Sequence, residues 1–153
     1  MILKTEKIIK EWTDYNGHMN LSYYILIFDK AAEVMLTKFN MGGDSAQSDK
    51  KSTFVVETHT TYDQEVKLGE EVEVYLTYLD HDKKRIHYKV SMFHKEKKYL
   101  AATTEVLTLY IDLNQRKVAE FEPKKTKIMD DFIQAHNSKF NSDKLVFSSK
   151  LKK

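Results

Sequence analysis

The residues most able to do chemistry lie together in one segment, D-Y-N-G-H-M-N, at positions 14–20. It holds a carboxylate (Asp14) and an imidazole (His18), with Asn16 and Gly17 between them. Carboxylates and imidazoles exchange protons or attack an electrophilic carbon in many enzymes, and a glycine lets a substrate approach the backbone closely. The segment therefore predicts a site for proton transfer or nucleophilic attack.

A long apolar helix is predicted directly after this segment, from Leu21 to Phe39. Its polar residues form only a narrow solvent-exposed stripe, so most of the helix surface must be buried. The first turn of a helix has unpaired N–H groups and a positive dipole end, which stabilise a developing oxyanion. Asn20 could instead serve only as the helix N-cap, with Asp14 a turn former and His18 a surface residue. The density of reactive groups at a buried helix favours the functional interpretation.

The rest of the chain predicts a sheet that wraps this helix. We expect a first strand over residues 3–12, a loop over 40–51 and a closing amphipathic helix over 125–136. Four segments alternate with period two, at 54–62, 72–78, 86–92 and 106–111, and polar connections suited to antiparallel hairpins join them. Two of the expected faces are Phe54-Val56-Thr58-Thr60-Tyr62 and Val72-Val74-Leu76-Tyr78. This is an α+β plan.

The length of 153 residues predicts one domain, over 1–138, followed by a solvated lysine-rich tail over 139–153. The net charge of +2 and the presence of only two arginines argue against a nucleic-acid partner. No apolar run is long enough for a membrane span, and the N-terminus lacks the apolar stretch of a signal peptide. We therefore expect a cytoplasmic protein with no membrane partner.

Other catalytic chemistries find little support in the sequence. The absence of cysteine excludes thiolate metal sites and a cysteine nucleophile. The six histidines are scattered without the spacing of a metal site, so we expect no metal. The serines lack a G-x-S-x-G setting, and Gly42-Gly43 is too short for a phosphate loop.

The stretch W-T-D-Y-N-G-H-M-N-L-S-Y-Y resembles the strand-to-helix motif of hotdog-fold thioesterases of the 4-hydroxybenzoyl-CoA type. With F-D and V-V-E-T-H-T further on, it is most similar to the thioesterases of carnitine breakdown, which act on betainyl-CoA. The similarity covers residues 5–112. It implies a hotdog fold, with a curved antiparallel sheet of about five strands around one long helix. It also implies hydrolysis of a small acyl-CoA thioester, with coenzyme A as part of the substrate and no separate cofactor.

The resemblance assigns roles residue by residue. Asp14 would attack the thioester or activate a water, while Asn16 and His18 would position that group and handle protons. Gly17 or a neighbour would donate a backbone N–H to the thioester oxygen. Glu57 would join the network as a second carboxylate, unless it is simply an outward-facing strand residue.

Residues for substrate binding follow from the same comparison. We expect Gly17, Asn20, Tyr24 and His59 to contact the substrate, although Asn20 also suits a helix cap and Tyr24 a core position. Nearby aromatic side chains could enclose a quaternary ammonium group. Relatives pair two sheets with the active site between subunits, so we expect a homodimer or a dimer of dimers, with Glu57 facing Asp14 of the partner chain.

Two other functions remain open at this point. Because the hotdog fold also hosts lyases, the chain could be a hydratase or dehydratase, although their usual Asp/His or His/Glu placement is not seen. It could also be a binding module for acyl-CoA without catalysis. The fold alone cannot separate these possibilities.

Overall fold

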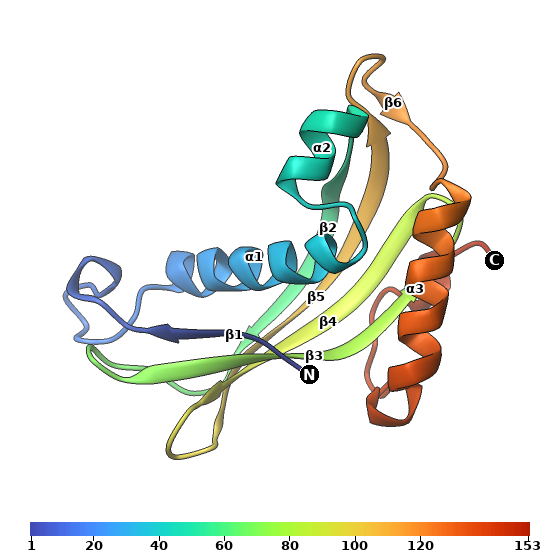
Figure 1. The fold of residues 1–153 in the computed structure, drawn as a ribbon. Coiled ribbons are helices and arrows are strands. Elements are labelled where there is room, and N and C mark those ends of the chain that lie inside the picture. The colour runs from blue at the N-terminus through green and yellow to red at the C-terminus, as the bar shows by residue number, and fades with distance from the viewer.

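Five long strands form one antiparallel sheet that bends around helix α1 (Leu21–Lys38), as Figure 1 shows. The computed structural model describes residues 1–153. The strands lie in the order β1 (Ile2–Lys7), β3 (Glu71–His81), β4 (Arg85–His94), β5 (Leu100–Asp112) and β2 (Lys51–Tyr62). A short strand β6 (Lys117–Val118) pairs with the end of β5. The expected α+β hotdog architecture is confirmed.

Helix α1 begins one residue after Asn20, whose side chain accepts a hydrogen bond from the Ser22 N–H and so caps the helix. One side of α1 supplies Ile27, Ala31 and Met35 to the main core, where all three are fully buried. The opposite side remains open, with Leu21, Ile25 and Leu26 exposed. The prediction that α1 is buried on most sides therefore holds for only part of its surface in a single chain.

The predicted strands exist, but two predicted faces are wrong beyond a β-bulge. In β2 the register shifts between Val55 and Glu57, so that Val55 and Thr58 both line the groove against α1. In β3 it shifts between Leu76 and Tyr78, and the Tyr78 ring packs on His87 and Phe140 instead of joining the core. A bulge inserts one residue and so reverses which side chains face the core.

Two further predictions from the sequence need correction. The first strand ends at Lys7, and a 3-10 turn (Lys10–Trp12) follows it. The expected loop over 40–51 contains helix α2 (Gly43–Asp49), whose first N–H is capped by the Glu33 carboxylate at 2.7 Å. The closing helix α3 (Pro123–His136) is present as predicted, and the Phe132 ring packs edge-on against Phe39 at the end of α1.

The C-terminal segment is not the solvated tail that its lysines predict. Its chain runs along the face of the sheet opposite α1. The Glu105 carboxylate accepts hydrogen bonds from the N–H groups of Val146 and Phe147 at 2.8 Å, and from His87 Nε2 at 2.7 Å. The side chain of Phe147 is buried there against the His87 ring. The segment therefore covers part of the sheet face around Glu105 and His87.

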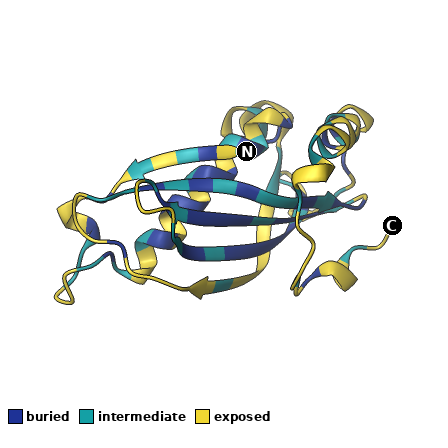
Figure 2. Cartoon of the chain, turned by 90° about the horizontal axis from the view of Figure 1, so that it is seen from below, coloured by how far each residue is buried: buried dark blue, intermediate teal, exposed yellow.

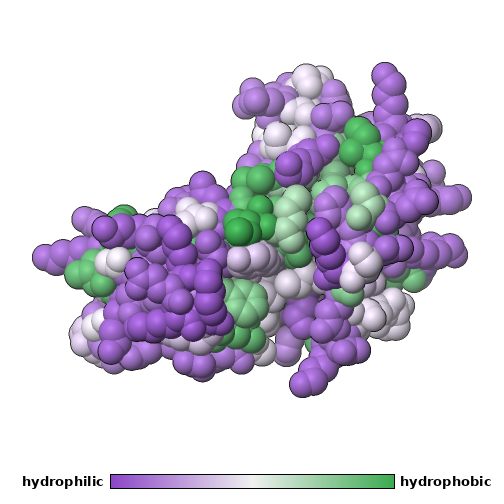
Figure 3. Space-filling view, turned by 60° about the horizontal axis from the view of Figure 1, so that its bottom comes forward, coloured by the Kyte–Doolittle hydropathy of each residue, from purple (hydrophilic) through white to green (hydrophobic).

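Exposure differs sharply across the sheet. Figure 2 shows the central strands largely buried, whereas the edge strands present many exposed residues. The face seen in Figure 3 is mainly hydrophilic, with its apolar side chains gathered in a band across the middle. None of the helices has the length and apolar character needed to cross a membrane.

Candidate active site

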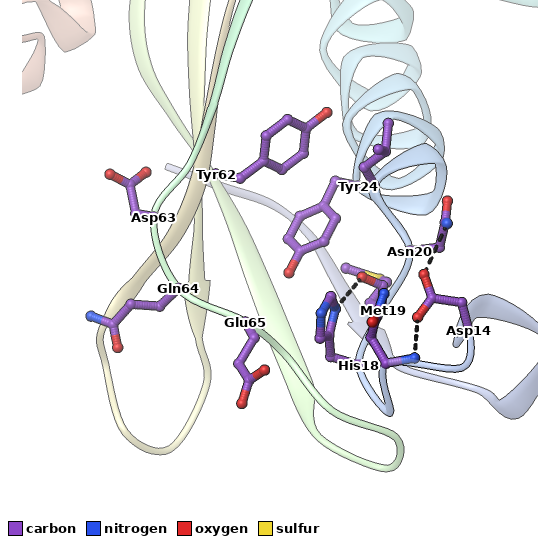
Figure 4. Close-up of a pocket in the computed structure, with 11 residues that line it drawn as sticks. Asp14, His18, Met19, Asn20, Tyr24, Tyr62, Asp63, Gln64 and Glu65 are labelled. Atoms are coloured by element: carbon purple, nitrogen blue, oxygen red, sulfur yellow. Dashed lines mark hydrogen bonds between the residues drawn. The ribbon is translucent and has the colours of Figure 1, made fainter.

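A cavity of about 370 Å³ lies where α1 begins, and it contains most of the predicted site residues. Figure 4 shows residues from both walls. One wall comes from the polar segment and the first turn of α1, and the other from the end of β2 and the residues after it. The lining residues are Asp14, Asn16, His18, Met19, Asn20, Leu21, Tyr24, Tyr62, Asp63, Gln64 and Glu65.

Asp14 is held at the cavity by two neighbours. Its Oδ1 accepts from the Asn16 N–H at 2.8 Å, and its Oδ2 accepts from Asn20 Nδ2 at 3.1 Å. These two hydrogen bonds, chiefly the first, lower the pKa of the Asp14 carboxyl below its ordinary value. Asp14 is therefore a carboxylate at neutral pH, ready to act as a base or nucleophile.

The glycine of the segment shapes a turn and does not offer its N–H to a ligand. Gly17 has φ of +77°, a conformation that favours glycine, and its N–H donates to the Asp14 carbonyl at 3.0 Å. The expected role of Gly17 as a direct donor to the substrate is thus not supported. Among the first N–H groups of α1, that of Ser22 is taken by Asn20, whereas that of Leu21 has no acceptor in the protein. Leu21 is also one of the residues that line the cavity.

His18 has a defined orientation at the same cavity. Its Nδ1 lies 3.0 Å from the Met19 carbonyl oxygen. Because a carbonyl oxygen only accepts, Nδ1 carries the proton in this contact and Nε2 is left with a lone pair. In the neutral ring, Nε2 can therefore accept a hydrogen bond.

Glu57 and His59 lie outside the cavity. Both are exposed on β2, and the Glu57 carboxylate accepts from Lys150 Nζ of the C-terminal segment at 3.4 Å. The structure therefore does not bring Glu57 to Asp14 within one chain, and the expected contact of His59 with substrate is not formed by this cavity. A contact of either residue with the site would require a second chain.

The second wall was not predicted from the sequence. Tyr62, Asp63, Gln64 and Glu65 reach the cavity because β2 pairs with β5 along its whole length and then passes the polar segment. The Met19 N–H donates to the Val66 carbonyl at 2.8 Å and fixes the two walls together. Period-two alternation located the strand but carried no information about which loop its end would meet.

A separate cavity of about 230 Å³ lies further along α1. It is found between Ile25 and Phe28 on the helix and Val55, Thr58 and other residues on the sheet, and its walls are mostly apolar.

The role of Asn20 gives a prediction at the site. Asn20→Ala removes the helix cap, and we expect the free energy of unfolding to fall by about 1 kcal/mol. It also removes one of the two hydrogen bonds that lower the Asp14 pKa, so the acid limb of the pH–kcat/KM profile should move to higher pH. Asn16→Ala is the comparison, because Asn16 donates to Asp14 mainly through its backbone N–H, which alanine keeps, and it should move that limb less than Asn20→Ala does. An unchanged limb in Asn20→Ala would contradict the assignment.

Comparison with known proteins agrees with this geometry. The family model of the thioesterase-like superfamily matches residues 9–135. The chain is 28% identical to a betainyl-CoA thioesterase of Pseudomonas aeruginosa over 131 residues, covering 86% of this chain and 82% of that protein. It is 32% identical over 112 residues to an L-carnitine dehydrogenase/betainyl-CoA thioesterase of Rhizobium meliloti, covering 72% of this chain but only 22% of that longer protein.

Solved structures share the fold over most or all of the chain. A Staphylococcus aureus protein in complex with CoA superposes with a TM-score of 0.82 at 23% identity, covering 100% of this chain and 94% of that one. A 1,4-dihydroxy-2-naphthoyl-CoA thioesterase from Synechocystis gives 0.74 at 17% identity, covering 84% and 94%.

The chain belongs to the thioesterase-like superfamily. The class of enzyme that this family defines is a thioester hydrolase.

Proposed function

We propose that the protein hydrolyses an acyl-CoA thioester to a free acid and coenzyme A at the Asp14 cavity. The observation that carries this proposal is the cavity at the start of α1, which is lined both by Asp14 and by Leu21, a residue whose N–H has no acceptor in the protein. The names of the relatives and the CoA complex of a protein with the same fold support CoA as the thiol.

The geometry supports a separate role in the reaction for Asp14, Leu21 and His18. Asp14 either attacks the thioester carbonyl or takes a proton from an attacking water. The Leu21 N–H, at the positive end of the helix dipole, stabilises the oxyanion that forms. In the general-base route the proton that Asp14 takes from water passes, directly or through His18 Nε2, to the departing CoA sulfur. In the nucleophilic route CoA leaves as the thiolate, and a water then hydrolyses the anhydride formed between Asp14 and the acyl group.

The acyl group proposed is betainyl, a small group with a quaternary ammonium next to the carbonyl. The similarity to betainyl-CoA thioesterases supports it. The volume of the Asp14 cavity, about 370 Å³, accommodates a short acyl group of this kind.

A thiol-release assay tests the proposal. Betainyl, acetyl, isobutyryl, octanoyl and benzoyl CoA esters are incubated with the protein, and released CoA is measured with a thiol-reactive dye. A binding module would show saturable binding without thiol release, and a hydratase would change an enoyl ester without releasing CoA. Either result would refute the proposal.

The assembly proposed is a homodimer, or a dimer of such dimers, that pairs along the β2 edge. Strand β2 has no neighbour on its outer side, and Val55, Val56 and the helix residue Ile25 are all more than 40% exposed. An exposed apolar edge of this kind favours pairing with another chain. We also propose that the protein is cytoplasmic.

Disrupting this edge should break the dimer. Val56→Lys places a charge on the outer strand, and we expect sedimentation velocity to shift from a dimer to the 18.0 kDa monomer. Lys117→Glu, on the short strand β6 away from this edge, is the control and should sediment like the wild type. A wild-type protein that sediments as a monomer would contradict the dimer.

A further inference from the structure

The second wall of the Asp14 cavity is aromatic at its centre. The ring of Tyr62 meets that of Tyr24 edge-on, with centroids 5.3 Å apart and an interplanar angle of 86°. Tyr24 is only 4% exposed and lines the cavity beside Tyr62. The two rings therefore offer an aromatic surface to a ligand in the cavity.

This wall is held firmly in place. The Tyr99 hydroxyl donates to the Glu65 carbonyl at 2.7 Å, and the Val66 carbonyl accepts from the Met19 N–H at 2.8 Å. These contacts fix the Glu65 backbone next to the polar segment. Figure 4 shows the Glu65 side chain on the side of His18, whereas the side chains of Asp63 and Gln64 point away.

The formal charges that line the cavity are all negative. Asp14, Asp63 and Glu65 line it, and no lysine or arginine does. The nearest cation to Glu65 is Lys67 at 3.3 Å, but both side chains are more than half exposed, so this ion pair is weak. The field in the cavity therefore favours a positive group and disfavours an anionic acyl group such as succinyl.

We propose that Tyr62 and Glu65 select acyl groups that carry a fixed positive charge close to the thioester carbonyl. This inference rests on the proposed hydrolysis of acyl-CoA and names the side chains that would discriminate among substrates. A quaternary ammonium has no N–H to donate, so it is held by aromatic surfaces and by nearby negative charge. Tyr24 and Tyr62 supply the first and Glu65 the second, while Asp14 remains free for the reaction.

The test compares two CoA esters of equal shape. In 3,3-dimethylbutanoyl-CoA a carbon replaces the nitrogen of betainyl-CoA, so that only the charge differs. We expect the wild type to favour betainyl-CoA by about tenfold or more in kcat/KM at low salt, which corresponds to the strength of a partly desolvated cation–π and ionic contact. The preference should shrink as salt is added.

Variants identify the residues responsible for this preference. Glu65→Gln and Tyr62→Leu should each reduce the ratio of the two kcat/KM values by about fivefold. Glu96→Gln removes the same formal charge at an exposed turn position outside the cavity, and should change the ratio by less than about twofold. Circular dichroism checks folding, and the ratio of Kd values for the two esters, measured in an Asp14→Asn background, repeats the comparison without turnover.

The outcomes separate the two proposals. Equal hydrolysis of both esters by the wild type, or an unchanged ratio in Glu65→Gln and Tyr62→Leu, would overturn the charge selection while leaving acyl-CoA hydrolysis intact. Hydrolysis of other acyl-CoA esters but of neither test ester would also overturn the charge selection while leaving acyl-CoA hydrolysis intact. Failure to release CoA from any ester would overturn the proposed function and this inference with it.

Discussion

Asp14→Asn should lower kcat by about 10³-fold on every acyl-CoA that the protein hydrolyses, because asparagine can neither take a proton nor attack the thioester. The substitution keeps the size of the side chain and can still accept from the Asn16 N–H, so the turn should survive. The Kd for the CoA ester should therefore change little. Steady-state thiol release gives kcat, and titration calorimetry gives the Kd.

The matched control for this variant is Asp44→Asn, which makes the same change at an exposed position on α2, outside the cavity. It should retain wild-type turnover. An Asp14→Asn protein with full turnover on any active ester would refute the assignment of Asp14, whatever the outcome for the other residues of the cavity.

Glu105→Ala should destabilise the fold by about 3 kcal/mol, the largest change in stability that we predict. The substitution leaves the N–H groups of Val146 and Phe147 and the ring of His87 without their acceptor in a buried setting. Urea denaturation measures the loss. Hydrogen exchange should show that the amides of residues 140–150 lose protection before the rest of the chain.

Glu57→Ala is the control, since Glu57 is a glutamate on the neighbouring strand with one exposed contact, to Lys150. Its effect should stay below about 0.5 kcal/mol. Equal losses in the two variants would show that Glu105 has no special role.

Acid should release the same segment in the wild type. Burial by itself raises the pKa of Glu105, but the hydrogen bonds from Val146, Phe147 and His87 outweigh it and leave the pKa below its ordinary value. Its contribution to stability is therefore fully present above the unfolded pKa of about 4.3 and is lost as the pH falls through the lower folded value. Protection of residues 140–150 that does not change on acidification would contradict this.

The parts of the site that depend on local sequence could be predicted. Asp14, Asn16 and His18 line the cavity because they directly precede α1, and the same few residues encode the Asn20 cap. Helix periodicity needs no knowledge of distant partners, so the bounds of α1 agree with the prediction within one residue.

The parts that depend on distant pairing could not be predicted. The bulge after Val55 arises from the pairing of β2 with β5, and alternation within one strand does not reveal it. The wall formed by Tyr62 and Glu65 meets Asp14 only after the chain has folded back across about fifty residues. The role of Gly17 was mistaken because a turn and an oxyanion site both favour glycine, and only the hydrogen bond to Asp14 distinguishes them.

The docking of the C-terminal segment has a consequence for how this part of the chain can change over evolution. Glu105 and Asp82 hold it through the main-chain N–H groups of Val146, Phe147 and Lys152, and these groups are the same for nearly all amino acids. Most side chains along the segment are therefore free to drift without loosening the attachment. Proline is the exception, because it lacks the N–H and would break the attachment at any of these three positions.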